Sequence, residues 1–207
     1  MKNTVMNSGT PPRAVGSSAP TAPDEVKVDE LPILLVAPPH PFEDGDKLER
    51  IMTGMGRYGW RGRPLLVLDL QGGDQGDLYS GYDIRHPWYK EALRGRAIAE
   101  RLMPESERVQ AIADYETAVG VSQGDGPPVP RYHALTGSHR YAAACAAGLR
   151  TIPCVYVDLA RLGAAGYRVV DLLGNDDGDV LRVLYEVGDE AAARLMQIEF
   201  DLAHFEQ

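Results

Sequence analysis

Apolar and polar positions divide the chain into segments of two kinds. Helical spacing of apolar residues marks residues 47–58, and Gly59 ends that pattern, which predicts a helix with one buried face. Strand-like patterns, either compact apolar runs or an alternation of polar and apolar positions, mark four segments: 31–37, 64–70, 131–135 and 151–157. Because such runs are typical of buried strands, we predict an α/β protein of the mixed α+β kind with a small sheet.

A long stretch separates the second of these strands from the third. It spans about sixty residues, too many for a plain loop in a compact domain. Pro87 is suited to begin a helix that runs to about residue 103, and Pro104 to begin another that runs to about 119. We therefore expect one domain over residues 30–159, with a helical insertion at about 72–130.

Both ends of the chain differ from this domain. Residues 1–29 are rich in Pro, Ser, Thr, Gly and Ala without apolar periodicity, which predicts a disordered tail. After residue 159 we expect a short turn, a helical piece over 167–173, and helices through Tyr185 and over 189–205. Apolar residues recur at helical spacing in the last helix, which predicts that this face packs on the domain: Leu195, Ile198, Leu202 and Phe205. Residues 160–207 are thus expected to form a C-terminal helical extension.

The most informative stretch is residues 131–159, RYHALTGSHRYAAACAAGLRTIPCVYVDL. It predicts a strand, a glycine turn, an alanine-rich helix capped by Ser138 and ended by Gly148, and a further strand. A helix that begins after a glycine turn offers unpaired N–H groups and the positive end of its dipole to an anion. The candidate anion site consists of Thr136, Gly137, Ser138, His139 and Arg140. The alternative is a merely structural turn with a solvated arginine.

Length and charge narrow the classes of function. A chain of 207 residues accommodates one principal domain. Its net charge of -9 repels polyphosphate backbones, so we expect no nucleic-acid partner. The densest basic run, Arg57, Arg61 and Arg63 around Trp60, is interpreted as a solvated helix end followed by a loop.

Cysteine usage and hydropathy point to a reducing compartment. Cys145 and Cys154 both lie in apolar surroundings, which predicts two buried thiols rather than a disulfide or a zinc site. No apolar run approaches the roughly 18 residues of a membrane span. We expect a cytoplasmic protein without membrane contact, and its oligomeric state and any metal ligands stay open.

The order of these features resembles the ParB/sulfiredoxin-fold superfamily, often labelled ParB-like nuclease domain. The resemblance covers residues 31–70 and 131–159. It rests on a Tyr-Gly helix end, a strand that opens Arg-Pro-Leu, and three later matches: Gly137-Ser138-His139-Arg140, Gly148-Leu149 and Ile152-Pro153. The resemblance implies that the GxxR turn binds nucleotide phosphates, of CTP in partition proteins and of ATP in sulfiredoxins and free-serine kinases.

The branches of this superfamily differ at particular positions. Sulfiredoxins carry their catalytic cysteine where this chain has Ser138, and a hydroxyl does not support their thiol chemistry. Partition proteins continue into a helix-turn-helix module, which the short acidic C-terminal segment does not resemble. The free-serine-kinase branch is closest in outline, with a Pro-His pair like Pro39-His40 and a loop glutamate like Glu43. That branch tends to have Asp where this chain has Thr136.

These observations together lead to one functional hypothesis. We expect an enzyme that transfers a phosphoryl group from a nucleoside triphosphate with Mg²⁺, ATP favoured over CTP, to a small hydroxylated substrate, or that hydrolyses the nucleotide. Glu43 or His40 is the expected catalytic base, and His139 is expected to bond phosphate oxygens. The insertion is expected to act as a lid, with four residues in the acceptor pocket: Tyr79, Tyr82, Arg85 and His86.

Other classes of function stay open. A noncatalytic nucleotide-sensing or protein-binding module would use the same turn without turnover. The third hypothesis is a ParB-like DNA-binding or nuclease protein. Glu43 also fits a solvated acidic loop, and Tyr82 also fits an aromatic that pins the insertion to the core.

Overall fold

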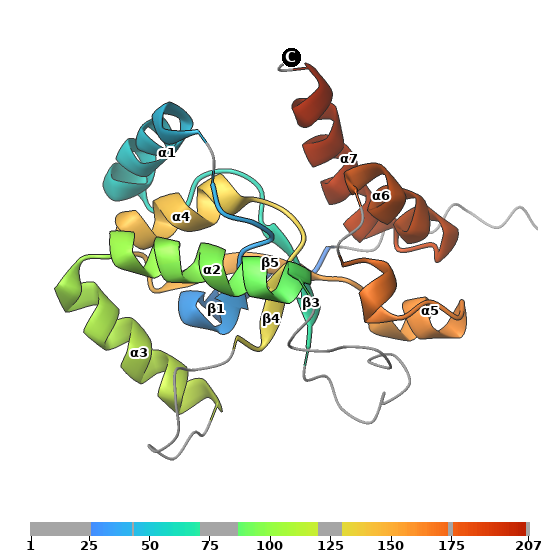
Figure 1. The fold of residues 1–207 in the computed structure, drawn as a ribbon, viewed down its shortest axis with the longest axis horizontal. Coiled ribbons are helices and arrows are strands. Elements are labelled where there is room, and N and C mark those ends of the chain that lie inside the picture. Colours follow the sequence, from blue (N-terminus) through green and yellow to red (C-terminus); the bar gives the residue numbers. More distant parts are fainter. Residues whose placement is uncertain (1–25, 43, 71–86, 120–129, 174–175, 206–207) are drawn as a thin grey trace, which may run out of the picture.

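The computed structural model describes residues 26–42, 44–70, 87–119, 130–173 and 176–205 (Figure 1). A five-stranded sheet is flanked by helices on both sides, so the expected mixed α+β class is confirmed. The strands are β1 (Asp29–Pro32), β2 (Val36–Ala37), β3 (Leu65–Asp69), β4 (Tyr132–Ala134) and β5 (Thr151–Tyr156).

Strand β3 is the centre of the sheet, whose order is β1-β5-β3-β4-β2. It pairs in parallel with β5 and antiparallel with β4, while the edge strands β1 and β2 pair with β5 and β4. The two edge strands are joined directly by a 3-10 turn, η1 (Ile33–Leu35). Because so short a link connects opposite edges, the sheet must curl.

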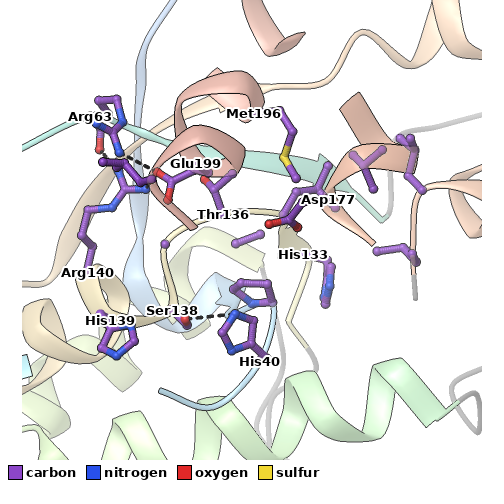
Figure 2. A pocket seen from close by; sticks show the side chains of 18 of the residues that line it. His40, Arg63, His133, Thr136, Ser138, His139, Arg140, Asp177, Met196 and Glu199 are labelled. Carbon is purple, nitrogen blue, oxygen red and sulfur yellow. Dashed lines mark hydrogen bonds and ion pairs between the residues drawn. The ribbon is translucent and has the colours of Figure 1, made fainter. Parts of the chain in front are cut away.

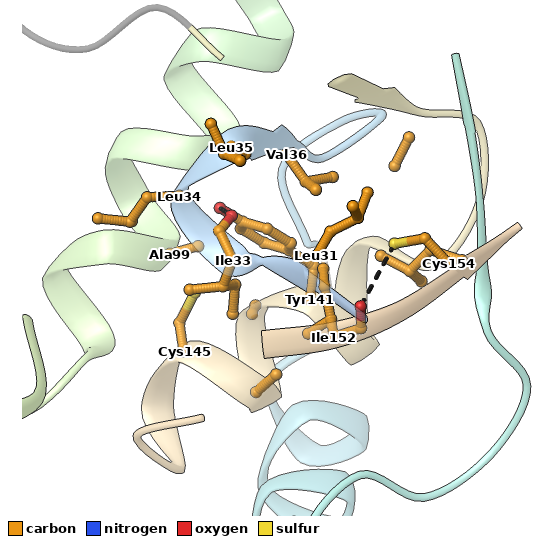
Figure 3. Packing of buried hydrophobic residues seen from close by; sticks show 14 of the residues in the cluster. Leu31, Ile33, Leu34, Leu35, Val36, Ala99, Tyr141, Cys145, Ile152 and Cys154 are labelled. Carbon is orange, nitrogen blue, oxygen red and sulfur yellow. Dashed lines mark hydrogen bonds between the residues drawn. The ribbon is translucent and has the colours of Figure 1, made fainter. Parts of the chain in front are cut away.

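The apolar run at 31–37 is therefore not the single strand that its pattern predicts. It is broken at Ile33, whose N–H donates to the Arg150 carbonyl at 2.8 Å and whose carbonyl accepts from the Tyr141 hydroxyl at 3.1 Å. Figure 3 shows Tyr141 inside the bend, beside Leu31 and Ile33. The residues are buried on either side of the bend, so hydrophobicity alone does not distinguish one strand from two.

Alternation along β3 divides the core in two. Leu65 and Val67 join a cluster with α1 (Gly45–Tyr58) and α4 (Ser138–Ala146), while Leu66 and Leu68 join a cluster with the C-terminal helices. Successive strand residues point to opposite faces, so β3 is buried on both. Figure 1 shows α1–α4 on one side of the sheet and α5–α7 on the other.

The two helices expected in the insertion are confirmed. They are α2 (Pro87–Leu102), which packs on α4, and α3 (Glu105–Val119), which packs on β1 and η1. Both cover the core on the same side of the sheet as α1. The insertion thus completes one wall of the domain.

The C-terminal extension departs from its prediction in two places. A helix, α5 (Leu159–Ala164), replaces the expected turn because Asp158 caps it, accepting from the N–H groups of Ala160 and Arg161 at 3.0 and 3.1 Å. The helical piece expected over 167–173 contains only a 3-10 turn, η2 (Val169–Asp171).

The last two helices are α6 (Asp177–Glu186) and α7 (Glu190–Phe205). The face predicted to pack from α7 is confirmed at Leu195, which packs against the core, and is wrong at Ile198 and Leu202, which are 39% and 41% exposed. The buried positions are Ala192, Ala193 and Met196. The small side chains of Ala192 and Ala193 let α7 lie close to α6, with which it packs.

Both cysteines are buried and free, as expected. Burial raises the pKa of the Cys145 and Cys154 thiols, which keeps them protonated and unreactive. In the described parts of the chain, no helix has the length and apolar character needed to cross a membrane.

Candidate functional site

A cavity of about 660 Å³ lies where the turn before α4 meets the C-terminal helices. Part of its wall comes from the loop after β2, the start of α1, Arg63 before β3, and β4 with the turn that follows it. The rest comes from the two leucines that follow η2 and from α6 and α7. The volume is in the range of small-molecule sites. Residues far apart in the sequence therefore share one concave surface.

The turn is held by Gly137, which has φ 85° and ψ 39° and is the N-cap residue of α4. A Cβ atom there would lie 2.4 Å from Leu65 Cδ2 and 2.9 Å from Arg140 Nη2, so only glycine fits. Ser138 is the first helical residue rather than the expected cap. The first intrahelical bond runs from Tyr141 N to Gly137 O at 2.9 Å. The N–H groups of the three residues before Tyr141 therefore have no acceptor within the helix, and these residues lie at the cavity wall.

Thr136 is bound into the fold. Its hydroxyl oxygen accepts from Leu66 N–H at 3.0 Å, and the residue is buried. This bond fastens the turn to the central strand. Thr136 also lines the cavity, and its contact with phosphate stays a prediction.

Arg140 lies in a cluster of three charged side chains (Figure 2). Its guanidinium donates to the Arg63 carbonyl at 2.6 Å and to the Glu199 carboxylate. Glu199 also accepts from Arg63 Nη2 at 2.9 Å. The interpretation of Arg63 as a solvated loop residue is wrong, because α7 supplies a carboxylate that the local sequence does not contain.

This Arg63–Glu199–Arg140 cluster has an electrostatic consequence. The Arg140 side chain is 12% exposed; burial lowers its pKa, and the Glu199 carboxylate opposes that change. Two cations share one anion, so the cluster keeps one positive charge. Any phosphate group that reaches Arg140 competes with Glu199 for it.

His40 lies against the turn. Its Nε2 is 3.3 Å from the Ser138 hydroxyl oxygen, and its Nδ1 is 2.8 Å from the Pro41 carbonyl. A carbonyl oxygen only accepts, so Nδ1 carries the proton and Nε2 of the neutral ring accepts from Ser138. The loop after β2 is thereby joined to the start of α4.

His139 makes a second link between this loop and the turn. Its Nε2 accepts from the Asp44 N–H at 3.1 Å, and its ring lies 6.3 Å from that of Phe42. Asp44 in turn caps α1 by accepting from Lys47 N–H at 2.9 Å, a bond that lowers the pKa of its carboxyl group. Nε2 of His139 is therefore occupied, and Nδ1 carries the proton of the neutral ring.

Several cavity residues were not predicted as site residues: Lys47, His133, Asp177, Met196 and Glu199. His133 is buried on β4, and burial lowers its pKa from 6.5 to about 3, so its imidazole is neutral. Asp177 and Glu199 come from α6 and α7, far along the chain. Nothing in the local sequence indicates that these two carboxylates reach the cavity, because that depends on how α6 and α7 lie beside the turn.

The helices that close the cavity are α6 and α7. Among the described residues of the insertion, none lines it, and residues 72–86 and 120–129, on which the prediction of a lid depends, lie outside the described residues. Glu43 and the four predicted acceptor-pocket residues, Tyr79, Tyr82, Arg85 and His86, lie outside the described residues.

Comparison of this chain with protein-family models, curated proteins and solved structures found no match. The case for a function therefore rests on the cavity. Two carboxylates, Asp177 and Glu199, line it, but the described residues contain no group of three side chains spaced to hold a metal ion. The site offers cations, helix N–H groups and imidazoles to an anionic ligand.

Proposed function

We propose that this protein binds a nucleoside triphosphate with its phosphates at the N-terminus of α4 and transfers the terminal phosphoryl group to a small hydroxylated substrate or to water. The observation that carries the proposal is the convergence, on one cavity of about 660 Å³, of the Gly137 turn with Arg63 and Arg140. Helix N–H groups and guanidinium forks both favour phosphate oxygens.

The charge distribution supports an anionic ligand. The whole chain has a net charge of -9, yet Lys47 also lines the cavity beside the two arginines. A local excess of positive charge on an acidic protein attracts a small anion without attracting nucleic acid. The proposal therefore favours a nucleotide over a DNA substrate.

The carboxylates of the cavity are compatible with Mg²⁺ when a nucleotide supplies its remaining ligands. Magnesium needs only one or two protein carboxylates when phosphates supply further ligands. Asp177 and Glu199 are the cavity carboxylates that would hold it. The ion would neutralise charge on the phosphates during transfer.

His40 is the group best placed to accept a proton. It lines the cavity, and Nε2 is the acceptor atom of its neutral ring. Glu43 remains the other proposed base. The resemblance to the free-serine-kinase branch supports the same turn as the phosphate site and favours ATP over CTP.

The test is turnover with a panel of nucleotides and acceptors. The full chain with ATP, GTP or CTP and Mg²⁺ is expected to release nucleoside diphosphate, faster in the presence of one class of hydroxylated metabolite. Binding without release of diphosphate would favour a noncatalytic nucleotide-sensing module. Absence of binding for every nucleotide would overturn the proposal.

A further inference from the structure

The Ser138 hydroxyl has a partner that helix formation does not explain. Ser138 is not the cap of α4, since Gly137 occupies that position. Its Oγ instead meets Nε2 of His40 at 3.3 Å (Figure 2), 98 residues away in sequence. A hydroxyl that caps no helix and bonds an imidazole is a candidate for chemistry.

The imidazole is oriented to act as a base. Its Nδ1 donates to the Pro41 carbonyl at 2.8 Å, which fixes Nε2 as the atom that accepts the Ser138 proton. A nucleophile bonded to a base that is itself held by a third group is the arrangement that activates serine in covalent catalysis. Hydrogen bonds of this kind are often long in the absence of substrate.

The surroundings of Ser138 indicate which kind of electrophile its hydroxyl would attack. Ser138 and His40 both line the cavity, and Ser138 is 5% exposed, so little of it meets bulk water. It stands at the start of α4, where N–H groups and the helix dipole stabilise developing negative charge. Arg140 lies two residues further along α4 and lines the same cavity. A phosphoryl group suits this environment.

We infer that Ser138 is a nucleophile that takes the terminal phosphoryl group from the nucleotide, with His40 as its general base; the inference rests on the proposed function. The Oγ lone pair forms a bond to the γ-phosphorus while the hydroxyl proton passes to Nε2 of His40. The bond from this phosphorus to the bridging oxygen breaks, and its electron pair leaves with the nucleoside diphosphate.

A second step returns the enzyme to its starting state. The oxygen of the acceptor hydroxyl, or of water, attacks the phosphorus of phosphoserine and loses its proton to solvent. The bond between phosphorus and Oγ breaks, and His40 returns its proton to Oγ. His40 thus acts as the general base of the first half-reaction and as the general acid of the second.

The experiment is to incubate the full chain with Mg²⁺ and ATP, GTP or CTP radiolabelled in the γ-phosphoryl group, then to quench in acid and map the label by mass spectrometry. We expect an acid-stable phosphoryl group on Ser138 that is chased into product at least as fast as turnover. Label should be lost in Ser138→Ala and unchanged in Ser106→Ala, an exposed serine of α3.

His40→Ala tests the base. We expect the rate of labelling to fall by roughly 10²–10⁴ while nucleotide affinity, measured by calorimetry, stays within a few-fold of wild type. Added imidazole should restore part of the rate, which a merely structural role of His40 would not allow. Loss of labelling without such rescue would remove His40 from the mechanism.

Failure of this inference is distinguishable from failure of the proposed function. Turnover in Ser138→Ala near the wild-type rate, or an acid-stable label on a residue other than Ser138, would overturn the serine nucleophile and leave phosphoryl transfer standing. A wild-type chain that binds no nucleotide would overturn both.

Discussion

Glu199 determines how the cavity is charged. Its carboxylate is shared by Arg63 and Arg140, and two neighbouring guanidinium groups without it would repel one another in a partly buried setting. A ligand phosphate would relieve that repulsion. Glu199 therefore acts as an internal competitor for the proposed nucleotide.

Glu199→Gln is expected to raise affinity for ATP. The uncompensated cluster should cost about 1–3 kcal/mol of stability without ligand, and bound phosphate should restore part of that loss. Calorimetry gives the affinity, and thermal unfolding with and without pyrophosphate gives the stability. The matched control is Glu186→Gln, which removes an exposed carboxylate paired with Arg182 outside the cavity. A lower ATP affinity in Glu199→Gln would show that the carboxylate assists binding.

His133 makes stability depend on pH. Its pKa falls from 6.5 to about 3 on folding, so between these values the unfolded state binds the extra proton and stability is lost as pH falls. For a fully buried group the loss from about pH 7 to about pH 4.5 is roughly 2–3 kcal/mol. His133→Gln should lose correspondingly less in urea titrations at the two pH values. Equal losses in both proteins would contradict the assignment.

At the scale of elements, the turn before α4 is where sequence and structure agree best. The glycine turn, the alanine-rich helix and its Gly148 stop were predictable because each depends on local backbone geometry. Ser138 was misassigned as the cap because Gly137, with its left-handed backbone, already closes the turn. The break at Ile33 could not be predicted, since it depends on Tyr141 and Arg150, which lie more than a hundred positions away.

Gly137→Ala, compared with Gly166→Ala, separates the cost of close packing at this turn from the cost of its left-handed backbone. Gly166 has φ 82°, close to the 85° of Gly137, but has no neighbour within 4 Å of an added Cβ. Gly166→Ala should therefore cost about 1–2 kcal/mol for the left-handed backbone alone. Gly137→Ala should cost a further 1–3 kcal/mol because its Cβ meets Leu65 and Arg140. Chemical denaturation of both variants measures the difference, and equal costs would show that the turn is not tightly packed.

At the scale of the whole molecule, the C-terminal extension completes the cavity that the turn begins. Its helices were largely predictable from apolar spacing, but their contribution to the site was not. Sequence periodicity shows which face of a helix is apolar and does not show what that face meets. Asp177 and Glu199 thus became cavity residues only when α6 and α7 were placed beside the turn. The described helices of the insertion pack on α4, η1 and the edge strand β1.

Calorimetric titration with ATP and Mg²⁺ tests the central claim most directly, because it asks whether phosphates bind where α4 begins. Arg140→Ala is compared with wild type and with Arg182→Ala, which removes an exposed arginine of α6 outside the cavity. Loss of a charge-assisted contact of about 1.5–3 kcal/mol predicts that ATP binds Arg140→Ala at least about tenfold more weakly, while Arg182→Ala binds as wild type does. Equal affinity of all three proteins for ATP would contradict the account.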